Sequence, residues 1–258
     1  MKLRTKNYIQ KALVSKLFNE QLYNKIKLNK IIMDYLLGMD YENCRTLFKN
    51  TIKPDSVVLD IGANMGQYAC RLNKIIKNGA IYSFEPYQKN YFSLLKMKKL
   101  LNMDNVNPIH SAISEKKGTL KLMIPVIDKN LIVGTQAVLE EFKRTDYENV
   151  KYYEEIVSVN TIDSFVAENN INRIDFIKID TEGAEIGILK GGIESIRKYT
   201  PVLSVEISPA SVELNFIYEL GYKPYIIHNK SLIQYDPLNK SIKAKGNLIL
   251  INTKTTSI

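Results

Sequence analysis

Cysteine, long hydrophobic runs and acidic residues near the amino terminus are all scarce in this 258-residue chain. The two cysteines, Cys44 and Cys70, lie far apart and match no metal-binding spacing, which excludes a cysteine-based zinc site and fits a reducing cytoplasm. No stretch approaches the ~20 apolar residues that span a bilayer. The charged start also lacks the apolar segment of a signal peptide. We therefore expect a cytoplasmic protein without a transmembrane segment.

The scarcity of acids at the start leaves a basic segment. Only Glu20 is acidic within the first thirty residues, where the basic residues are Lys2, Arg4, Lys6, Lys11, Lys16, Lys25, Lys27 and Lys30. The whole chain carries a net charge of +9, from 36 basic and 27 acidic residues. Such a segment can attract nucleic acid, an acidic membrane surface or an anionic substrate, but we favour a solvated helix face. Peripheral membrane contact through this segment stays an open alternative.

The remaining composition predicts one main domain preceded by helices. With 45% hydrophobic residues, the chain can bury a sizeable core. We expect an N-terminal helical extension over 1–50, with helices in 5–30, 31–37 and 41–50, and a main domain over 51–258. These helices would pack against the main domain or a second copy of the chain, so a homo-oligomer is one expectation.

Apolar strands alternate with amphipathic helices after residue 50. Expected strands cover 57–61, 80–84, 105–114, 118–125, 157–159, 174–180, 201–207, 222–227, 231–235 and 247–251, and expected helices include 67–76, 88–101, 161–169 and 210–220. This alternation is typical of right-handed strand–helix–strand units. It predicts an α/β fold with a doubly wound, mainly parallel, seven-stranded Rossmann-like sheet and an antiparallel C-terminal strand. The region 125–153 reads as an irregular loop or lid over a site.

The stretch Val57–Gly66 joins a buried strand to a glycine turn and a helix start. A dinucleotide fingerprint has glycine at the middle position of this turn, where this chain has Asn64. Asp60 precedes the first glycine by two residues, where an acid can hold a cationic amino group but would repel a pyrophosphate. We expect Gly62 and Gly66 to let a ligand approach the backbone, and the turn to point N–H groups at it. The turn therefore favours S-adenosylmethionine over NAD.

Polar residues also follow the next two predicted strands. Glu85 lies close to the ~20-residue offset after the glycine turn at which a strand-end carboxylate binds ribose hydroxyls. Ser111 and Ala112 follow the third strand, where the cofactor base is expected. The full set expected to bind the cofactor is Asp60, Gly62, Ala63, Asn64, Gly66, Gln67, Tyr68, Glu85, Pro86, Ser111, Ala112 and Asp180.

A second charged stretch, Ile174–Glu185, ends another apolar strand with Lys178, Asp180 and Glu182. Charge at the end of a buried strand is costly unless a ligand, ion or partner uses it. Glu206 lies near the end of the strand predicted over 201–207. We expect these strand ends to face the same crevice as the glycine turn.

Taken together, these residues resemble the FkbM family of S-adenosylmethionine-dependent methyltransferases. The likeness covers roughly residues 42–225, and its pieces are Asp60–Gly66, Phe84–Pro86, Thr161–Asp163, Ile174–Glu185, Gly191 and Pro201–Glu206. The Lys-x-Asp-x-Glu-Gly-x-Glu run is much more specific than the glycine turn. The resemblance implies a class I methyltransferase fold and an O-methyltransferase that acts on a sugar, a glycan or a secondary metabolite.

Methyl transfer to a hydroxyl group requires alignment of the reactants and removal of a proton. We assign the proton acceptor to Asp180 and Glu182, supported by Glu206. Lys178 would orient the acceptor or neutralise these carboxylates. The three acids would also suit Mg²⁺, although no residue demands a metal.

Three alternatives stay open. The first is an RNA methyltransferase, which the positive net charge favours. Methylation of a base amino group would need an Asn/Asp-Pro-Pro-aromatic motif where this chain has Asp180 to Gly183, so only ribose methylation stays open. We expect a small-molecule or glycan acceptor rather than nucleic acid. Asn64 disfavours an NAD-dependent oxidoreductase. The third alternative is a non-catalytic binding protein that retains the fold.

Overall fold

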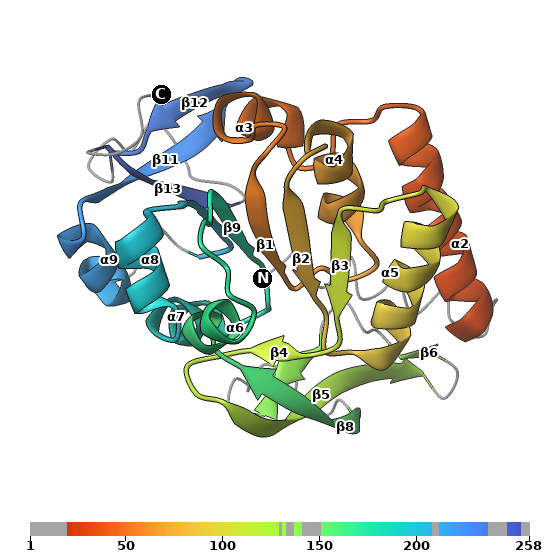
Figure 1. Cartoon of the computed structure of the whole chain (residues 1–258). Coiled ribbons are helices and arrows are strands. Elements are labelled where there is room, and N and C mark those ends of the chain that lie inside the picture. The colour runs from red at the N-terminus through yellow and green to blue at the C-terminus, as the bar shows by residue number, and fades with distance from the viewer. Residues whose placement is uncertain are drawn as a thin grey trace.

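The computed structural model describes residues 20–128, 131–132, 137–140, 151–207, 212–236 and 247–253. Its centre is a sheet with the strand order β12-β11-β13-β10-β9-β1-β2-β3 (Figure 1). These strands are β1 (Val57–Ile61), β2 (Ala80–Phe84), β3 (Val106–Ile109), β9 (Phe176–Ile179), β10 (Val202–Val205), β11 (Tyr222–His228), β12 (Ser231–Gln234) and β13 (Leu248–Asn252). The helices are α2 (Glu20–Leu36), α3 (Cys44–Thr51), α4 (Gln67–Ile75), α5 (Gln88–Leu100), α6 (Ile162–Glu168), α7 (Glu185–Lys190), α8 (Ile193–Tyr199) and α9 (Asn215–Glu219), with a 3₁₀ turn at Val212–Leu214.

The sheet is mainly parallel, as the alternation of strands and helices predicts. β3, β2, β1, β9 and β10 pair in parallel, whereas β13 runs antiparallel to both β10 and β11. The doubly wound α/β fold is therefore confirmed. The described part of the sheet has eight strands rather than the expected seven, because β12 pairs antiparallel along the outer edge of β11.

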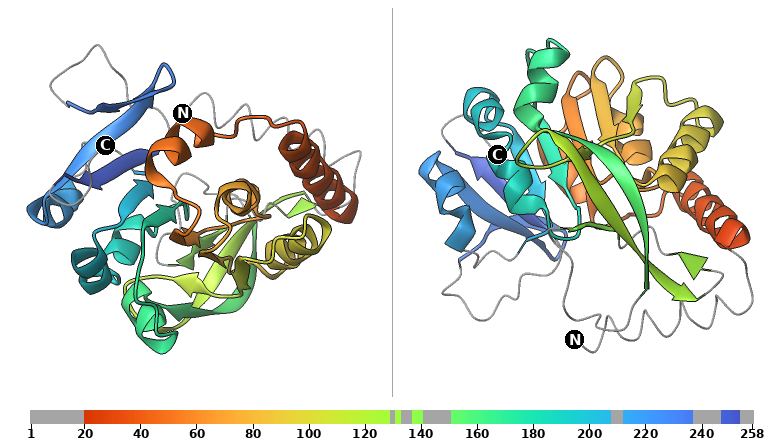
Figure 2. Two further views of the ribbon diagram at one scale, coloured as in Figure 1. Left: turned by 45° about the horizontal axis from the view of Figure 1, so that its top comes forward. Right: turned by 90° about the horizontal axis from the view of Figure 1, so that it is seen from below.

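Helices cover both faces of the sheet (Figures 1 and 2). One hydrophobic cluster joins α2, α3, α4 and α5 to the sheet through residues such as Leu47, Leu72 and Leu94. The other joins α6, α7, α8 and α9 through residues such as Phe165 and Ile188. Every residue of β9 and of β10 is buried between these two layers, including the polar Lys178 of β9 and Ser204 of β10.

The N-terminal helical region differs from its prediction chiefly in the number of helices before residue 37. α2 continues through Ile31 without a break, so the expected division between helices at 5–30 and 31–37 is wrong for the described residues. Leu28 and Ile31 lie on one helical face and are both buried, and no glycine or proline interrupts the helix between them. Residues 1–19 of the first predicted helix lie outside the described residues. Among the described helices, none combines the length and apolar character needed to cross a bilayer.

A second sheet lies across the end of the main sheet where β1 and β2 finish (Figure 1). It has the order β4-β8-β5-β6, with β7 paired to β5, and its strands are β4 (Ala112–Ile113), β5 (Gly118–Asp128), β6 (Leu131–Ile132), β7 (Val138–Leu139) and β8 (Lys151–Asn160). The irregular region expected over 125–153 is therefore partly strand. Residues 129–130, 133–136 and 141–150 of that predicted lid lie outside the described residues.

Candidate active site

A cavity of about 620 Å³ opens where β1, β2, β9 and β10 end, between the main sheet and the second sheet. Most residues that the sequence assigned to a site line this cavity: Gly62, Ala63, Asn64, Gln67, Tyr68, Glu85, Pro86, Ser111, Ala112, Lys178, Asp180, Glu182 and Glu206. Asp60 and Gly66 are not part of the lining. The strand-end acids Glu85, Asp180 and Glu206 and most of the glycine turn therefore line the same cavity.

The glycines of the first turn are required by contacts within the protein. Gly62 has a φ of +78°, and a Cβ atom there would lie 2.0 Å from the carbonyl oxygen of Asp180. At Gly66, with φ +96°, a Cβ atom would lie 2.7 Å from Leu94 Cδ1. Both glycines therefore have a packing reason, since the turn lies against the loop after β9 and against α5, and their contact with a ligand stays a prediction.

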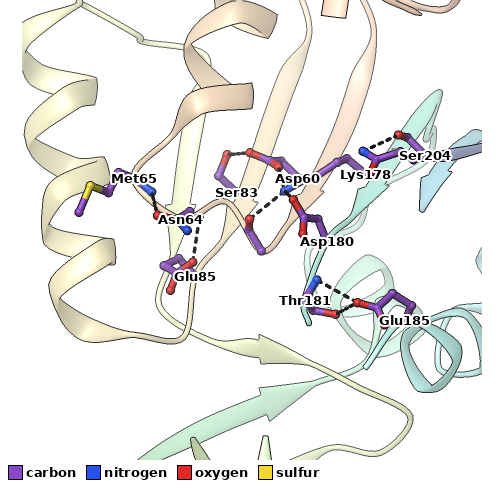
Figure 3. Close-up of polar contacts among 12 residues, drawn as sticks. Asp60, Asn64, Met65, Ser83, Glu85, Lys178, Asp180, Thr181, Glu185 and Ser204 are labelled. Carbon is purple, nitrogen blue, oxygen red and sulfur yellow. Dashed lines mark hydrogen bonds and ion pairs between the residues drawn. The ribbon is translucent and has the colours of Figure 1, made fainter. Parts of the chain in front are cut away.

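The first N–H groups of the turn bond to the protein itself. Gly62 N and Ala63 N both donate to the carbonyl oxygen of Phe84, at 3.0 and 2.9 Å. Asn64 N donates to Glu85 Oε2 at 2.8 Å (Figure 3). The prediction that the turn points its N–H groups at a ligand is wrong for these three, because they join the end of β1 to the end of β2.

Glu85 is the buried acid at the end of β2. Its Oε2 accepts the bond from Asn64 N, and its Oε1 accepts bonds from Tyr87 N at 3.0 Å and from Asn90 Nδ2 at 3.3 Å. Burial raises the pKa of Glu85 to about 7, although these hydrogen bonds oppose the rise. Each carboxylate oxygen offers two acceptor directions, so Glu85 retains capacity for a ligand hydroxyl in the cavity.

Asp60 has a different role from the one expected. Its side chain is fully buried, and its nearest cationic partner is Lys178 Nζ, 3.5 Å from Asp60 Oδ1 (Figure 3). Ser83 Oγ donates to Asp60 Oδ2 at 3.4 Å. Burial raises the pKa of Asp60, and Lys178 opposes this in part. Asp60 therefore holds the ammonium group of a lysine and does not face the cavity, contrary to its assignment as a direct ligand contact.

Lys178 connects both motifs. Its Nζ donates to the carbonyl oxygen of Gly62 at 2.8 Å and lies 3.5 Å from Asp180 Oδ2 (Figure 3). Burial opposes its charge, but the carboxylates of Asp180 and Asp60 outweigh burial and raise the pKa of Lys178. The ring of Tyr68 lies below the ammonium group, 5.2 Å from its centroid. Because only 3% of its side chain is exposed, Lys178 is better placed to position the two loops than to orient an acceptor.

The carboxylates beyond Lys178 form the other side of the cavity. Glu206 lies near Asp180, and its pKa is raised to about 8 by partial burial and then by the carboxylates of Asp180 and Glu182. Glu182 has a left-handed backbone with φ +60°. Its loop is held by Glu185 Oε1, which accepts bonds from Thr181 N, Thr181 Oγ1 and Gly183 N at 3.0–3.1 Å (Figure 3). Glu185 thus fixes the loop that carries the acids, a role that the sequence analysis did not assign.

Ser111 lines the cavity but also joins two strands of the second sheet. Its Oγ donates to the carbonyl oxygen of Ser158 at 3.1 Å and to that of Ala112 at 2.9 Å.

No three acidic, histidine or cysteine side chains in the described ranges converge as a metal site requires. The binding of Mg²⁺ by Asp180, Glu182 and Glu206 stays a prediction.

Comparison with known proteins identifies the family of this chain. A model of the methyltransferase FkbM domain matches residues 60–224. The chain belongs to the FkbM methyltransferase family.

Two curated proteins are similar to this FkbM family member. Methyltransferase 1 of Beauveria bassiana (strain ARSEF 2860) is 23% identical over 145 residues, which cover 53% of this chain and 58% of that protein. The 2-O-methyltransferase NoeI of Sinorhizobium fredii (strain NBRC 101917 / NGR234) is 25% identical over 211 residues, covering 78% of this chain and 82% of that protein. Among solved structures, a methyltransferase FkbM from Methylobacillus flagellatus KT is 17% identical with a TM-score of 0.49, covering 78% of this chain and 44% of that one.

The cavity also uses residues on both sides of the FkbM domain match. Tyr41, Glu42 and Asn43 precede it, and Ile227 and Asn247 follow it. The sequence analysis missed all five because their segments were assigned to a helical extension and to terminal strands. Two consecutive left-handed residues, Glu42 with φ +48° and Asn43 with φ +58°, turn the chain into α3 at this point. The edge-to-face contact between the rings of Tyr41 and Tyr68 then fixes the turn against α4.

Proposed function

We propose that this chain transfers the methyl group of S-adenosylmethionine to a hydroxyl group of a sugar, a glycan or another small molecule. The observation that carries the proposal is a single cavity lined by Glu85 and the Gly62 turn together with Asp180 and Glu206. Membership of the FkbM family supports methyl transfer. The name of the similar 2-O-methyltransferase NoeI supports an oxygen acceptor.

The side of the cavity near Glu85 suits S-adenosylmethionine. The cavity volume of about 620 Å³ falls in the range of small-molecule sites, roughly 300–1,000 Å³. The carboxylate of Glu85 can accept bonds from the ribose hydroxyls. Gln67 also lines the cavity, and its Oε1 is buried without a hydrogen-bond partner among the described residues, so it offers a further acceptor. When bound, S-adenosylmethionine supplies an electrophilic methyl group.

Asp180 is the group that we assign to take the proton of the acceptor hydroxyl. Lys178 Nζ lies 3.5 Å from Asp180 Oδ2 and forms an ion pair with it. Glu206, with a pKa of about 8, holds its proton at neutral pH and can donate a hydrogen bond to Asp180 or to the acceptor. A positioned base of this kind contributes a rate factor of ~10²–10⁴. Glu182, in the loop held by Glu185, lies at the same side of the cavity and is the second candidate base.

The charge of the acceptor side favours a hydroxyl compound over nucleic acid. Asp180, Glu182 and Glu42 line it with the protonated Glu206, and the cations of the lining are Lys27 and the buried Lys178. Phosphates would be repelled by this excess of carboxylates, and nucleic-acid sites rely on basic side chains instead. Carboxylates are good acceptors for the hydroxyl groups of sugars.

Transfer of a tritiated methyl group from S-adenosylmethionine to separated polysaccharide, oligosaccharide and RNA fractions tests the proposal. We expect label in a carbohydrate fraction and a loss of at least 100-fold in Asp180→Asn, since the variant lacks the base. The matched control is Glu194→Gln, which changes an exposed acid outside the cavity and should keep full activity. Asp163→Asn is unsuitable as a control, because Asp163 accepts hydrogen bonds from the first turn of α8. Label in RNA instead of carbohydrate would contradict the proposed acceptor, and unchanged labelling of carbohydrate by folded Asp180→Asn would contradict the assignment of Asp180 as the base.

A further inference from the structure

The first described helix, α2, has two apolar faces. One is buried in the core through Leu28 and Ile31, which are 4% and 7% exposed. The other is open and carries Leu22, Ile26, Met33 and Leu36, which are 42%, 47%, 53% and 63% exposed. Their spacing of four, seven and three residues places them on one side of the helix. We call these four residues the α2 stripe.

The α2 stripe lies on the outside of the molecule. All three views place α2 at its edge, beside α5 and away from the main sheet (Figures 1 and 2). Single exposed apolar residues are ordinary, but a row of them along one helix is typical of an interaction surface.

Basic residues accompany the α2 stripe. Exposed Lys25 and Lys30 lie on α2 itself, one on each side of the row, and Lys30 forms an exposed ion pair with Asp34 one turn later. The first thirty residues contain eight basic side chains against the single acid Glu20. An apolar row bordered by lysines is the pattern of a helix that lies in the interface of an anionic membrane, where apolar side chains enter the acyl boundary and lysines pair with lipid phosphates.

We propose that the α2 stripe docks this protein on the surface of an anionic lipid bilayer. A second copy of the chain is a poorer occupant, because two α2 stripes in contact would bring the lysines of two α2 helices, Lys25, Lys27 and Lys30 of each, close together. An anionic surface instead gains from both the apolar row and the positive charge. The proposal is independent of the methyl-transfer reaction.

Co-sedimentation of the full-length protein with lipid vesicles tests this docking. We expect binding to vesicles of phosphatidylglycerol and phosphatidylcholine, weakening in 0.5 M salt, and at least tenfold weaker binding to phosphatidylcholine alone. The double variant Ile26→Glu/Met33→Glu should lose at least tenfold in affinity for the anionic vesicles. The variant Ile156→Glu, at a site 70% exposed on β8, is the matched control and should bind as the wild type does.

Thermal unfolding of each variant checks that it is folded. We expect the double variant to fold, because Ile26 and Met33 are both exposed to solvent. Equal binding by wild type and by the α2 double variant would overturn the proposal, as would equal binding to neutral and anionic vesicles. Sedimentation velocity tests whether a second copy of the chain covers the α2 stripe. A concentration-dependent dimer that is lost in the double variant, together with no binding to vesicles, would also overturn the proposal.

Discussion

Replacing Lys178 by methionine tests the ion cluster on which the candidate site is built. The substitution removes a buried ammonium group that lies 3.5 Å from both Asp60 Oδ1 and Asp180 Oδ2 and donates to the Gly62 carbonyl oxygen at 2.8 Å. Asp60, which is fully buried, then has no cationic partner in the cluster. Breaking one side of a buried ion pair costs about 3–5 kcal/mol, because the remaining charge stays desolvated. For a chain of this size, that corresponds to a fall of roughly 6–20 °C in Tm.

The pH dependence of Lys178→Met separates this cause from a simple loss of packing. Burial already raises the pKa of Asp60, and removal of the ammonium raises it further. The folded variant therefore binds a proton on Asp60 at a pH where the unfolded chain, with a pKa near ~3.9, does not. Its free energy of unfolding should accordingly increase relative to wild type as the pH falls from 8 to 5.

Urea unfolding of wild type, Lys178→Met and Asp60→Asn/Lys178→Met at pH 8 and pH 5 measures these differences. The double variant, which removes both buried charges, should recover most of the stability that the single variant loses. A stability loss in Lys178→Met that is equal at both pH values, or no recovery in the double variant, would refute the reasoning.

Three further predictions concern the turns and acids around the cavity. Gly62→Ala should cost at least about 2 kcal/mol of unfolding free energy, since it combines a left-handed backbone with a 2.0 Å approach to the Asp180 carbonyl oxygen. Gly187→Ala, in α7 with its nearest outside neighbour at 3.5 Å, is the matched control and should stabilise by about 0.5–1 kcal/mol in the same urea titration. Glu206 has a folded pKa of about 8, above its ordinary value, so it takes up a proton on folding and wild type should lose stability as pH rises from 5 to 9. Glu206→Gln should flatten that slope, and an unchanged slope would show that Glu206 does not titrate there. Thr161→Ala removes the cap bond from Ser164 N at 3.0 Å and should lower the free energy of unfolding by about 1 kcal/mol, whereas Thr161→Ser should retain most of it.

The parts of the fold that follow from local patterns were predictable. Val57–Ile61 and Ala80–Phe84 are strands at the predicted bounds, because each is a short apolar run bounded by turn residues. A helix was expected over 161–169, and Thr161 caps it with a side chain that accepts a bond from Ser164 N. The end of β9 was expected to face the same crevice as the glycine turn, and the parallel pairing of β1 with β9 brings the two motifs together.

The second sheet was missed because only one half of β8 has the pattern of a strand. Val157 and Val159 are buried and alternate with exposed residues, but the preceding Lys151–Glu155 is charged and mostly solvent-facing. This half is a strand because it pairs with β5, from Ile124 opposite Tyr153 to Val126 opposite Lys151. Such pairing depends on residues more than twenty positions apart, which local propensity does not report.

The roles of the site residues were harder to predict than their location. The charges of Asp60 and Lys178 satisfy each other in the fold, so the acid at the end of β1 is withdrawn from the cavity. The N–H groups after β1 are used by Phe84 and Glu85 in the same way. Sequence spacing indicates which strand ends meet, but it does not show which polar groups pair with each other before a ligand arrives.

Calorimetric titration with S-adenosylhomocysteine is the most direct test of the central claim that this cavity holds the adenosyl cofactor. We expect wild type to bind, with an affinity that rises between pH 6 and pH 8 as Glu85, with a pKa of about 7, ionises and becomes a better acceptor for the ribose hydroxyls. Folded Glu85→Gln should bind roughly 10- to 150-fold more weakly, the equivalent of about 1.5–3 kcal/mol for a bond to a charged group, and should lose the pH dependence. Glu168→Gln, at an exposed acid on α6, should match wild type. No heat of binding with folded wild type, or equal affinity in Glu85→Gln, would contradict the account.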